Sequence, residues 1–462
     1  MAEPLSVPIG PEFVEKYNKP GPRYTSYPTV PAWKQAFGEA EYREALDELK
    51  GRPDDELAVY LHVPFCAKAC HYCGCNMLVT RDKDEVTAYL DRLEQELARV
   101  TDLIGTGRRV VQFHWGGGTP NYLKNPEVER VLAMFRAAFT IAPGAEVSLE
   151  IDPRIGSPEQ ARFLKEAGFN RISLGVQDFE PGVQKAIGRR QSRDKTLEVY
   201  HGCREAGFAG VNLDLVYGLP GQTRESFAAT LDEIVGLEPD RVACFSYAHV
   251  PWVRPNQEQV DTTIMLQGYE KFALFQLTVD RFRQGGYEWI GIDHFAKHDD
   301  ELSVALRERA LHRNFMGYAT KPAPHMLAFG MSGIGDVCDR FVQNDATIGG
   351  WSQAVDAGGL PIVKGHKLSD DDKLRRLAIL NLMCNLELPW ELTVAGWGER
   401  ADRLFADSLG QLPPLIADGL VTRDDFGLRI TAKGRYFVRN VAMILDAYLA
   451  QDIGKPLFSR TV

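Results

Sequence analysis

Residues 60–76 read Tyr60-Leu-His62-Val-Pro-Phe-Cys66-Ala-Lys-Ala-Cys70-His-Tyr72-Cys73-Gly-Cys75-Asn76. This stretch holds four of the eight cysteines of the chain within ten positions, and such clustering favours a metal site over a disulfide framework. Three thiolates spaced C-x₃-C-x₂-C, from Cys66, Cys70 and Cys73, can bind three irons of a 4Fe–4S cube and leave the fourth iron open. The stretch therefore predicts a reactive iron–sulfur centre.

The same residues leave other interpretations open. A structural zinc site is one alternative, although zinc normally uses paired C-x₂-C units. A closed ferredoxin-type cluster is another, with Cys75 as the fourth ligand. If Cys75 is not a ligand, it is a small residue beside the cluster. His62 is either a proton donor or a hydrogen-bonded structural residue of the strand.

From about residue 57 onward, short β-branched runs alternate with amphipathic segments, the pattern that builds parallel sheets. The predicted strands are 57–63, 109–115, 146–152, 171–177, 210–217 and 241–249. Segments 158–168 and 194–207 are predicted helices whose closing glycine can take the left-handed conformation. The pattern predicts an α/β fold with a partial (β/α)6 parallel barrel.

The length of 462 residues suits one large domain and a smaller one. We expect an N-terminal extension that wraps the active site (1–55), the barrel (56–300), a connecting segment that contributes to the active site (301–365), and a mainly helical, winged-helix-like C-terminal domain (366–462). A winged helix can bind DNA. The acidic balance, 53 Lys and Arg against 63 Asp and Glu, instead favours a packing or lid domain and no nucleic-acid partner.

The start of the sequence lacks a basic region followed by an apolar run, and no stretch has the length of a membrane helix. With 44% apolar and 25% charged residues, the composition is that of a folded globular protein. We therefore expect a cytoplasmic enzyme with no membrane partner.

Polar and glycine residues follow the ends of successive predicted strands, where parallel barrels bind their ligands. Glu150 alternates with Ser148 and Asp152, so all three should point to one face of the third strand. Glu150 could hold a ribose hydroxyl or an ammonium group, or form a structural pair with an arginine. The other candidates at this rim are Gly116-Gly117-Gly118-Thr119-Pro120, Gln177, Arg189, Asp214 and Tyr247-Ala248-His249.

Ten motifs occur in a recognisable order. They are Tyr24-Thr-Ser-Tyr-Pro-Thr29, His62-Val-Pro-Phe-Cys66, Cys73-Gly-Cys75-Asn76, His114-Trp-Gly-Gly-Gly-Thr-Pro120, Glu150-Ile-Asp-Pro-Arg154, Gly175-Val-Gln-Asp-Phe179, Asp214-Leu-Val-Tyr-Gly-Leu-Pro220, Tyr247-Ala-His249, Asp293-His-Phe-Ala296 and His312-Arg-Asn-Phe315. Together they resemble the oxygen-independent coproporphyrinogen III oxidase family of the radical S-adenosylmethionine (SAM) superfamily. The likeness runs from near residue 18 to the C-terminus.

This resemblance implies a radical-SAM barrel with one [4Fe–4S] cluster on Cys66, Cys70 and Cys73. It also implies two SAM molecules. The first would contact Tyr60, Tyr72, Gly117, Glu150 and Ile334, and the second would contact Gly118, Thr119, Gln177, Arg189, Asp214 and Ala248. The catalytic residues would be the three cysteines together with Tyr60 and Glu150.

The implied reaction converts two propionate side chains of coproporphyrinogen III to vinyl groups in haem biosynthesis. It implies an electron donor such as a flavodoxin or a ferredoxin, and we expect a monomer. The sequence departs from the family at Met316-Gly-Tyr-Ala319-Thr320, where Gln-Gly-Tyr-Thr-Thr is expected, and at Lys321-Pro-Ala-Pro-His325. The alternatives are methyl transfer or ring opening on another tetrapyrrole, and a haem-binding chaperone relative. Those chaperones usually carry Phe at the position of Cys75.

Overall fold

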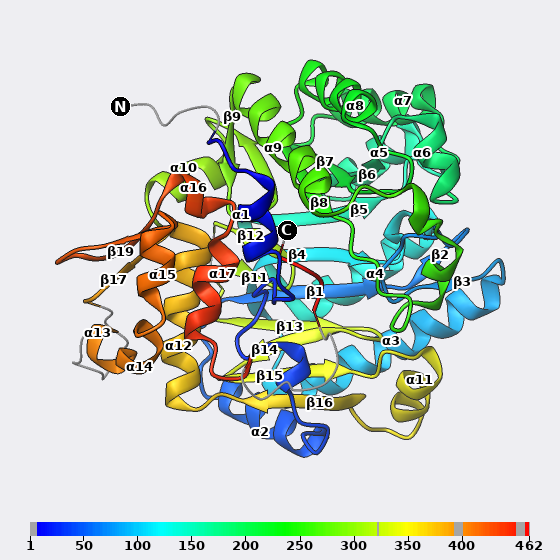
Figure 1. Ribbon diagram of the computed structural model, residues 1–462. Helices are drawn as coiled ribbons and strands as arrows, with labels where there is room; N and C mark the ends of the chain where they lie inside the picture. The colour runs from blue at the N-terminus through cyan, green and yellow to red at the C-terminus, as the bar shows by residue number, and fades with distance from the viewer. Residues whose placement is uncertain (1–6, 321–322, 392–400, 450–457, 462) are drawn as a thin grey trace.

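The computed structural model describes residues 7–320, 323–391, 401–449 and 458–461. One twelve-stranded sheet dominates it, in the order β16-β15-β14-β13-β1-β4-β5-β6-β7-β8-β10-β9 (Figure 1). The strands from β13 to β8 in this order are all parallel. They are β13 (His325–Phe329), β1 (Leu57–Val63), β4 (Arg108–Gly117), β5 (Phe139–Ile151), β6 (Arg171–Gln177), β7 (Gly210–Tyr217) and β8 (Arg241–Ser246).

Three predicted strands have the bounds seen in the structure, namely β1, β6 and β7. The other three differ. β4 is longer by a residue or two at each end, and β5 begins at Phe139 because its first residues pair with β4 before a register shift. β8 ends at Ser246, and the chain leaves the sheet after Tyr247 donates its backbone N–H to Tyr217 O. The predicted strand end at His249 was wrong, because His249 lies in the loop after β8.

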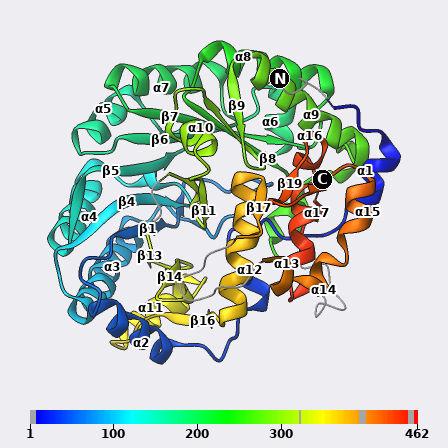
Figure 2. The ribbon, with the colours of Figure 1, turned by 90° about the vertical axis from the view of Figure 1, so that its left-hand side faces the viewer.

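Helices cover the outer face of the parallel strands (Figures 1 and 2). They are α3 (Lys83–Ile104), α4 (Asn125–Ala138), α5 (Pro158–Glu166), α7 (Arg193–Ala206), α8 (Arg224–Leu237) and α9 (Gly268–Gln284). The apolar residues of α3, among them Val86, Leu93 and Leu97, are buried. Gly168 and Gly207 have φ of 107° and 77° after α5 and α7, which confirms the predicted left-handed helix ends.

Residues 325–367 extend the sheet, which the sequence analysis did not predict. Strand β13 pairs with the free edge of β1, and β14 (Ile334–Val337), β15 (Arg340–Asn344) and β16 (Ile362–Lys367) continue antiparallel. At the other edge, β10 (His294–Lys297) and β9 (Tyr287–Ile290) are also antiparallel. A short hairpin, β11 (His312–Asn314) with β12 (Gly317–Ala319), lies outside this sheet.

The C-terminal region contains α12 (Asp370–Leu380), α15 (Leu412–Ala417), α16 (Ala432–Arg435) and α17 (Val438–Ala442). It also has a hairpin of β18 (Val421–Arg423) and β19 (Gly427–Ile430), to which β17 (Glu387–Pro389) adds a third strand. Figure 2 shows the large sheet as an arc whose opening lies beside α12 and α17. The structure therefore has the predicted partial barrel with a smaller, mainly helical C-terminal region.

The N-terminal segment, with α1 (Pro11–Tyr17) and α2 (Glu39–Lys50), runs along the barrel and the C-terminal helices. Arg439 of α17 fixes it by donating from Nε to the Pro22 carbonyl at 2.8 Å. Residues 1–6 of the predicted extension, and Lys321 and Pro322 of the unusual segment, lie outside the described residues. The predicted domain boundaries stay predictions.

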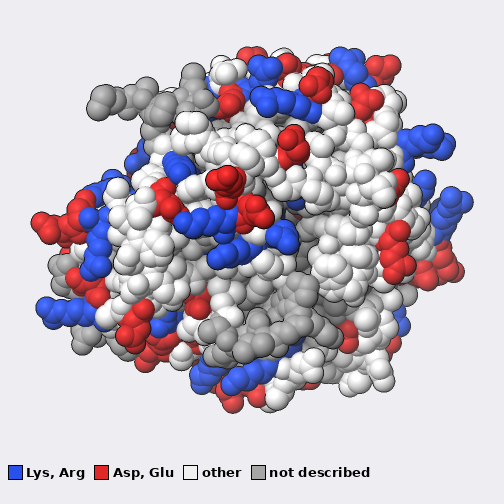
Figure 3. Space-filling view, viewed as in Figure 1, with Lys and Arg blue, Asp and Glu red and all other residues white. Residues whose placement is uncertain are grey.

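Acidic and basic side chains are interspersed over the face seen in Figure 3. Among the helices of the described residues, none combines the length and apolar character that a membrane span requires.

Candidate active site

The cysteine loop follows β1 at the carboxyl edge of the parallel strands. The Cys66, Cys70 and Cys73 side chains line one cavity of about 410 Å³. All eight cysteines of the chain fall in the described residues and none forms a disulfide. No three Cys, His, Asp or Glu side chains of the described residues converge on one point as ligands of a single ion.

The surroundings of the three thiols suit a negatively charged cluster. Cys70 Sγ accepts hydrogen bonds from Arg154 Nη2 and Arg189 Nη1, each at 3.5 Å. Hydrogen bonds from Cys75 lower the pKa of the Cys73 thiol to about 6. Burial raises the pKa of the Cys66 thiol to about 11, so a metal would have to displace its proton. The donor set and the nearby guanidinium groups fit a cluster held by three thiolates.

A loop beyond β8 holds the cysteine loop in place. The Asn256 side-chain amide donates to the carbonyl oxygens of Cys70, His71 and Cys73 at 3.1, 3.1 and 3.0 Å. Gln257 donates from Nε2 to Tyr72 O at 2.9 Å. Four consecutive residues of the loop thus have their carbonyl groups fixed. Neither residue was predicted from the sequence, since no spacing signal marks an amide that binds a distant backbone.

The glycines after β4 let the cysteine loop approach closely. A Cβ at Gly118 would lie 2.3 Å from Pro64 O and 2.6 Å from Pro64 C, which are both backbone atoms. Gly118 N also donates to Val63 O at 2.8 Å. Gly117 has φ of 119°, a conformation that L side chains rarely adopt. The glycine run is therefore required by packing against the chain itself, besides any role toward a ligand.

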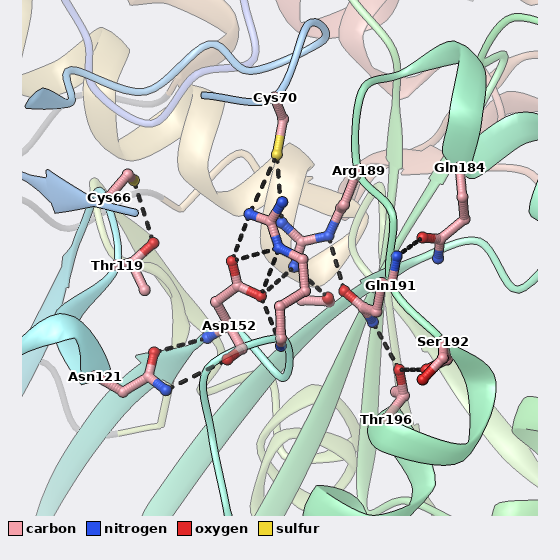
Figure 4. Close-up of polar contacts among 12 residues, drawn as sticks. Cys66, Cys70, Thr119, Asn121, Asp152, Gln184, Arg189, Gln191, Ser192 and Thr196 are labelled. Atoms are coloured by element: carbon pink, nitrogen blue, oxygen red, sulfur yellow. Dashed lines mark hydrogen bonds and ion pairs between the residues drawn. The ribbon is translucent and has the colours of Figure 1, made fainter. Parts of the chain in front are cut away.

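Asp152 forms ion pairs with Arg154 and Arg189, and all three residues line the cavity. Figure 4 shows Asp152 beside Arg189. Arg154 Nε donates to Asp152 Oδ2 at 2.9 Å, and Arg189 Nη2 donates to Asp152 Oδ1 at 3.2 Å. Burial raises the pKa of the Asp152 carboxyl, but Arg189 and Arg154 outweigh it, so the pKa lies below its usual value. Arg189 is further held by Gln191 Oε1, which accepts from its Nε at 2.9 Å. Arg154 is a charged residue of the site that the sequence analysis did not assign.

Most of the predicted site residues line the same cavity as the three cysteines. These are Tyr72, Gly117, Gly118, Thr119, Glu150, Gln177, Arg189, Asp214 and Ala248. The other two, Tyr60 and Ile334, line a neighbouring cavity of about 280 Å³. The two cavities meet at shared walls that include Gly117, Glu150 and Arg254. The predicted residues therefore divide between two adjoining spaces.

The wall of the second cavity contains a neutral histidine. His62 Nε2 lies 2.8 Å from Asn76 O, a carbonyl that can only accept, so Nε2 carries the proton. Nδ1 then accepts from Tyr60 OH at 3.1 Å. Burial lowers the pKa of His62 to about 4. With both ring nitrogens engaged, the geometry favours the structural interpretation of His62 and orients the Tyr60 hydroxyl.

Glu150 is the half-exposed carboxylate at the junction of the cavities. Its ion-pair partner in the described residues is His114, with Nε2 at 3.5 Å from Oε1, and not an arginine. Ser148 and Asp152 line these spaces too, which confirms that the three alternating side chains share one face. Burial, and then the charge of Glu150, raises the pKa of Asp214 to about 6.

The two departures from the family pattern lie in different places. Met316 lines the cavity of Tyr60 and also a third cavity, of about 180 Å³, inside the barrel. Ala319 lines a separate small cavity with Gly144 and Glu146. Of the two, Met316 is the one beside Glu150.

Comparison with known proteins agrees with this geometry. Residues 60–234 match the model of the radical SAM superfamily. The solved structure of coproporphyrinogen III oxidase (HemN) from Escherichia coli, described as a radical SAM enzyme, superposes with a TM-score of 0.88 at 41% identity, covering 92% of this chain and 97% of the other. The fold and the site thus define a radical SAM protein, a class whose membership implies a [4Fe–4S] cluster and SAM.

Relatives that match the full length of the chain identify its family within the radical SAM class. The oxygen-independent coproporphyrinogen III oxidases of Escherichia coli K12 and Synechocystis are 41% and 40% identical, over 97% and 99% of both chains. That of Pseudomonas aeruginosa is 36% identical over 98% of both chains, and residues 368–437 match the HemN C-terminal domain. The chain belongs to the oxygen-independent coproporphyrinogen III oxidase family.

Proposed function

We propose that this chain is an oxidoreductase that oxidatively decarboxylates two propionate side chains of coproporphyrinogen III, giving protoporphyrinogen IX in haem biosynthesis. The main support for this proposal is that three free thiols line one cavity. The chain that carries them is 41% identical to an oxygen-independent coproporphyrinogen III oxidase over 97% of both lengths. The alternative of a chaperone relative has no support from these relatives.

Cys66, Cys70 and Cys73 would hold the [4Fe–4S] cluster. Bound there, the cluster would supply the electron for reductive cleavage of SAM, the chemistry that generates a 5′-deoxyadenosyl radical able to take a hydrogen atom from the propionate β-carbon. Arg154 and Arg189 offset the negative charge of the thiolates, because both donate to Cys70 Sγ.

Two SAM molecules would occupy the adjoining cavities, as the resemblance implies. For the first we propose Tyr60, Tyr72, Gly117, Glu150 and Ile334, and for the second Gly118, Thr119, Gln177, Arg189, Asp214 and Ala248. The position of Glu150 at the shared wall supports a role in orienting a cationic ligand group, since its carboxylate is half-exposed and lacks an arginine partner in the described residues. Catalysis would rest on the three cysteines with Tyr60 and Glu150.

The proposal needs a one-electron donor, for which we propose a flavodoxin or a ferredoxin. We further propose that the enzyme acts as a monomer in the cytoplasm. Gel filtration of the purified protein at low and high concentration would test the monomeric state. We expect the same elution volume at both concentrations, near that of a globular protein with the chain mass of 51.6 kDa.

The deciding experiment is anaerobic incubation of the cluster-loaded, reduced protein with SAM and coproporphyrinogen III. We expect 5′-deoxyadenosine and protoporphyrinogen IX to form together, and neither to form with the Cys66→Ala protein. A different outcome would favour a second candidate function: SAM cleavage that depends on the tetrapyrrole but yields no protoporphyrinogen.

That second candidate is methyl transfer or ring opening on another tetrapyrrole. One observation favours it: Met316 lines the same cavity as Tyr60 and Glu150, at a position where the family pattern has Gln. Loss of a hydrogen-bonding group costs about 1 to 3 kcal/mol in a closed pocket. This is enough to shift substrate preference. Restoring the amide with Met316→Gln should raise kcat/KM for coproporphyrinogen III if the leading proposal holds.

A further inference from the structure

A sharp turn ends strand β6 at the wall of the cavity that the three cysteines line. Gln177, the central residue of this turn, has φ of 71°, and Asp178 N donates to Val176 O at 2.9 Å. A hydrogen bond that closes three residues around a positive φ makes a γ-turn of the rare, strained form. Few residues other than glycine adopt a positive φ. The turn therefore costs stability, and other contacts must hold it.

The turn follows a bulge in the pairing of β6 with β7. Gly175 lies opposite Asp214 and Gln177 lies opposite Leu215, so β6 has one residue more than β7 between these two pairs. Bulges occur next to active sites, where they redirect a side chain. The side chain concerned is that of Gln177, which lines the cavity of the cysteines, whereas Leu215 belongs to the apolar core.

The amide of Gln177 has no partner, although the residue is largely buried. Gln177 keeps 8% of its surface exposed, and among the residues that the structure describes its amide makes no hydrogen bond. Its Nε2 lies 2.7 Å from the point where a Cβ of Gly175 would stand, and Arg189 Nη2 lies 3.2 Å from the same point. Buried amides normally have partners, since an unpaired one costs free energy. A strained turn that presents such an amide to a cavity indicates a ligand site.

Asp178, the residue after Gln177, is fully buried, and its carboxylate is fixed by three hydrogen bonds. Oδ1 accepts from Thr230 Oγ1 at 2.7 Å and from Glu180 N at 2.8 Å, and Oδ2 accepts from Gln222 Nε2 at 2.6 Å. Thr230 belongs to α8, and Gln222 Nε2 also donates to Val216 O of β7 at 2.9 Å. The carboxylate thus anchors the exit of the turn to the neighbouring strand and helix.

The same loop also fixes Arg189. Gln184 donates from Nε2 to Asp178 O, and its Oε1 accepts from Gln191 N at 2.9 Å. Gln191 Oε1 in turn accepts from Arg189 Nε at 2.9 Å. Figure 4 shows Gln184, Gln191 and Arg189 in this chain of contacts. One hydrogen-bonded loop therefore sets both the amide of Gln177 and the guanidinium group of Arg189.

We infer that Asp178 is a positioning residue that holds the strained turn and so fixes the Gln177 amide in advance for a hydrogen-bonding group of SAM in this cavity. The inference rests on the proposed binding of SAM. An amide that is ordered before the ligand arrives spares the complex the free energy of ordering it, which raises affinity. The strain at Gln177 opposes this arrangement, and the hydrogen bonds of the Asp178 carboxylate offset the strain.

The test measures binding of radiolabelled SAM to the cluster-loaded protein by anaerobic equilibrium dialysis. The cluster stays oxidised, so that SAM is not cleaved. Gln177→Ala should weaken one SAM site about 10-fold, the effect of losing one hydrogen bond. Asp178→Asn places an N–H donor against donors and should weaken the same site. In the double variant Asp178→Asn should add no further loss, because it acts through Gln177.

Two results would overturn the inference. One is unchanged SAM affinity in Asp178→Asn, and the other is a loss of the same size with and without the Gln177 amide, as general damage to the fold would give. Asp194→Asn is the matched control, since it makes the same exchange at a side chain that is 97% exposed, and it should leave SAM binding unchanged.

Thr230 provides milder variants that carry the test if Asp178→Asn does not fold. Thr230→Val removes the hydroxyl that donates to Asp178 and should weaken the same SAM site. Thr230→Ser keeps the hydroxyl and should bind SAM as the wild-type protein does. Equal SAM affinities of the two Thr230 variants would contradict the inference.

The unfolding temperature tests the strain separately. Gln177→Gly relieves the positive φ that Gln177→Ala retains, so the glycine variant should unfold about 1 to 3 °C above the alanine variant. The opposite order would show an unstrained turn and overturn the inference. The predicted SAM binding in a wild-type protein that does not decarboxylate coproporphyrinogen III would refute the proposed function and leave the role of Asp178 standing. Decarboxylation together with SAM binding that ignores Asp178 would do the reverse.

Discussion

Arg189 donates a hydrogen bond from Nη1 to the Sγ of Cys70 at 3.5 Å. The same guanidinium binds Asp152 through Nη2, so one buried cation joins the cysteine loop to the floor of the cavity. Removing Arg189 would take away a positive charge that offsets the negative charges of the Cys70 thiolate and the Asp152 carboxylate.

We predict that Arg189→Gln lowers the unfolding temperature and weakens SAM binding. Breaking a buried ion pair by removing one partner costs about 3 to 5 kcal/mol. Differential scanning calorimetry and equilibrium dialysis with SAM measure the two effects. Because Arg189 and Asp152 share one interaction, the double variant with Asp152→Asn should lose less stability than the sum of the single variants. Additive losses would contradict the pairing.

The cysteine variants separate an open cluster from a closed one. Cys66→Ala, Cys70→Ala and Cys73→Ala should each lose bound iron, while Cys75→Ala should keep it. The control Cys203→Ala, at a buried position of helix α7, should keep it as well. Iron analysis and the visible absorption of the anaerobic protein give the answer. Iron loss in Cys75→Ala would indicate four thiolate ligands.

Asn256 offers a test of how the cysteine loop is held. Its amide donates to three loop carbonyls, so Asn256→Ala should speed the loss of iron to a chelator. The neighbouring Gln259→Ala serves as control, because Gln259 is exposed and its side-chain amide donates to Asn256 O rather than to the cysteine loop. An unchanged rate of iron release in Asn256→Ala would show that the cluster loop needs no such support.

Alanine substitutions at two glycines beside the thiols should differ in their effect on stability and iron binding. Gly118→Ala puts a methyl group into the Pro64 backbone, and overpacking of this kind costs about 1 to 3 kcal/mol. Gly74→Ala meets no atom within 4 Å. We expect a lower unfolding temperature and less iron in the first variant only. Equal behaviour of the two would mean that the chain near Pro64 moves freely.

Glu96 of α3 predicts a pH effect on stability. Its carboxylate is buried and accepts from Gly330 N, Asn344 Nδ2 and Trp351 Nε1 at 2.9, 2.6 and 3.1 Å. Burial raises its pKa to about 7 from the usual 4.5. The folded state therefore holds this proton more tightly, so the contribution of Glu96 is present below pH 4.5 and is lost as the pH rises through 7.

Relative to Glu96→Gln, the wild-type protein should lose up to about 3 kcal/mol of stability between pH 4.5 and pH 8. Urea unfolding of both proteins across this range measures the difference. Glu94→Gln on the same helix is the control, because its carboxylate is exposed and pairs with Arg130 on the surface. A difference that does not vary with pH would show that Glu96 stays ionised throughout.

The sequence predicted those elements whose signals are local. Strands β6 and β7 are short apolar runs bounded by turns and helices, and the cysteines of 66–73 carry their chemistry in their spacing. Strand β13 escaped prediction because five residues make a weak pattern, and its partner β1 lies more than 250 positions earlier. Asn256 escaped for the same reason, since its amide binds carbonyl groups 183 to 186 positions earlier. Arg154 pairs with the nearby Asp152, but its contact with Cys70 spans 84 positions and leaves no signal in the sequence.

The pairing of β1 with β13 has a consequence for synthesis. A ribosome that has released residues 57–63 must extend the chain to residue 325 before that strand edge finds its partner. During this interval a strand that is largely buried in the mature protein offers unpaired amide and carbonyl groups to other chains, which invites aggregation. Truncated products that stop after β8 should accordingly accumulate in inclusion bodies, and chaperones that cover exposed strand edges should raise the yield of the intact protein.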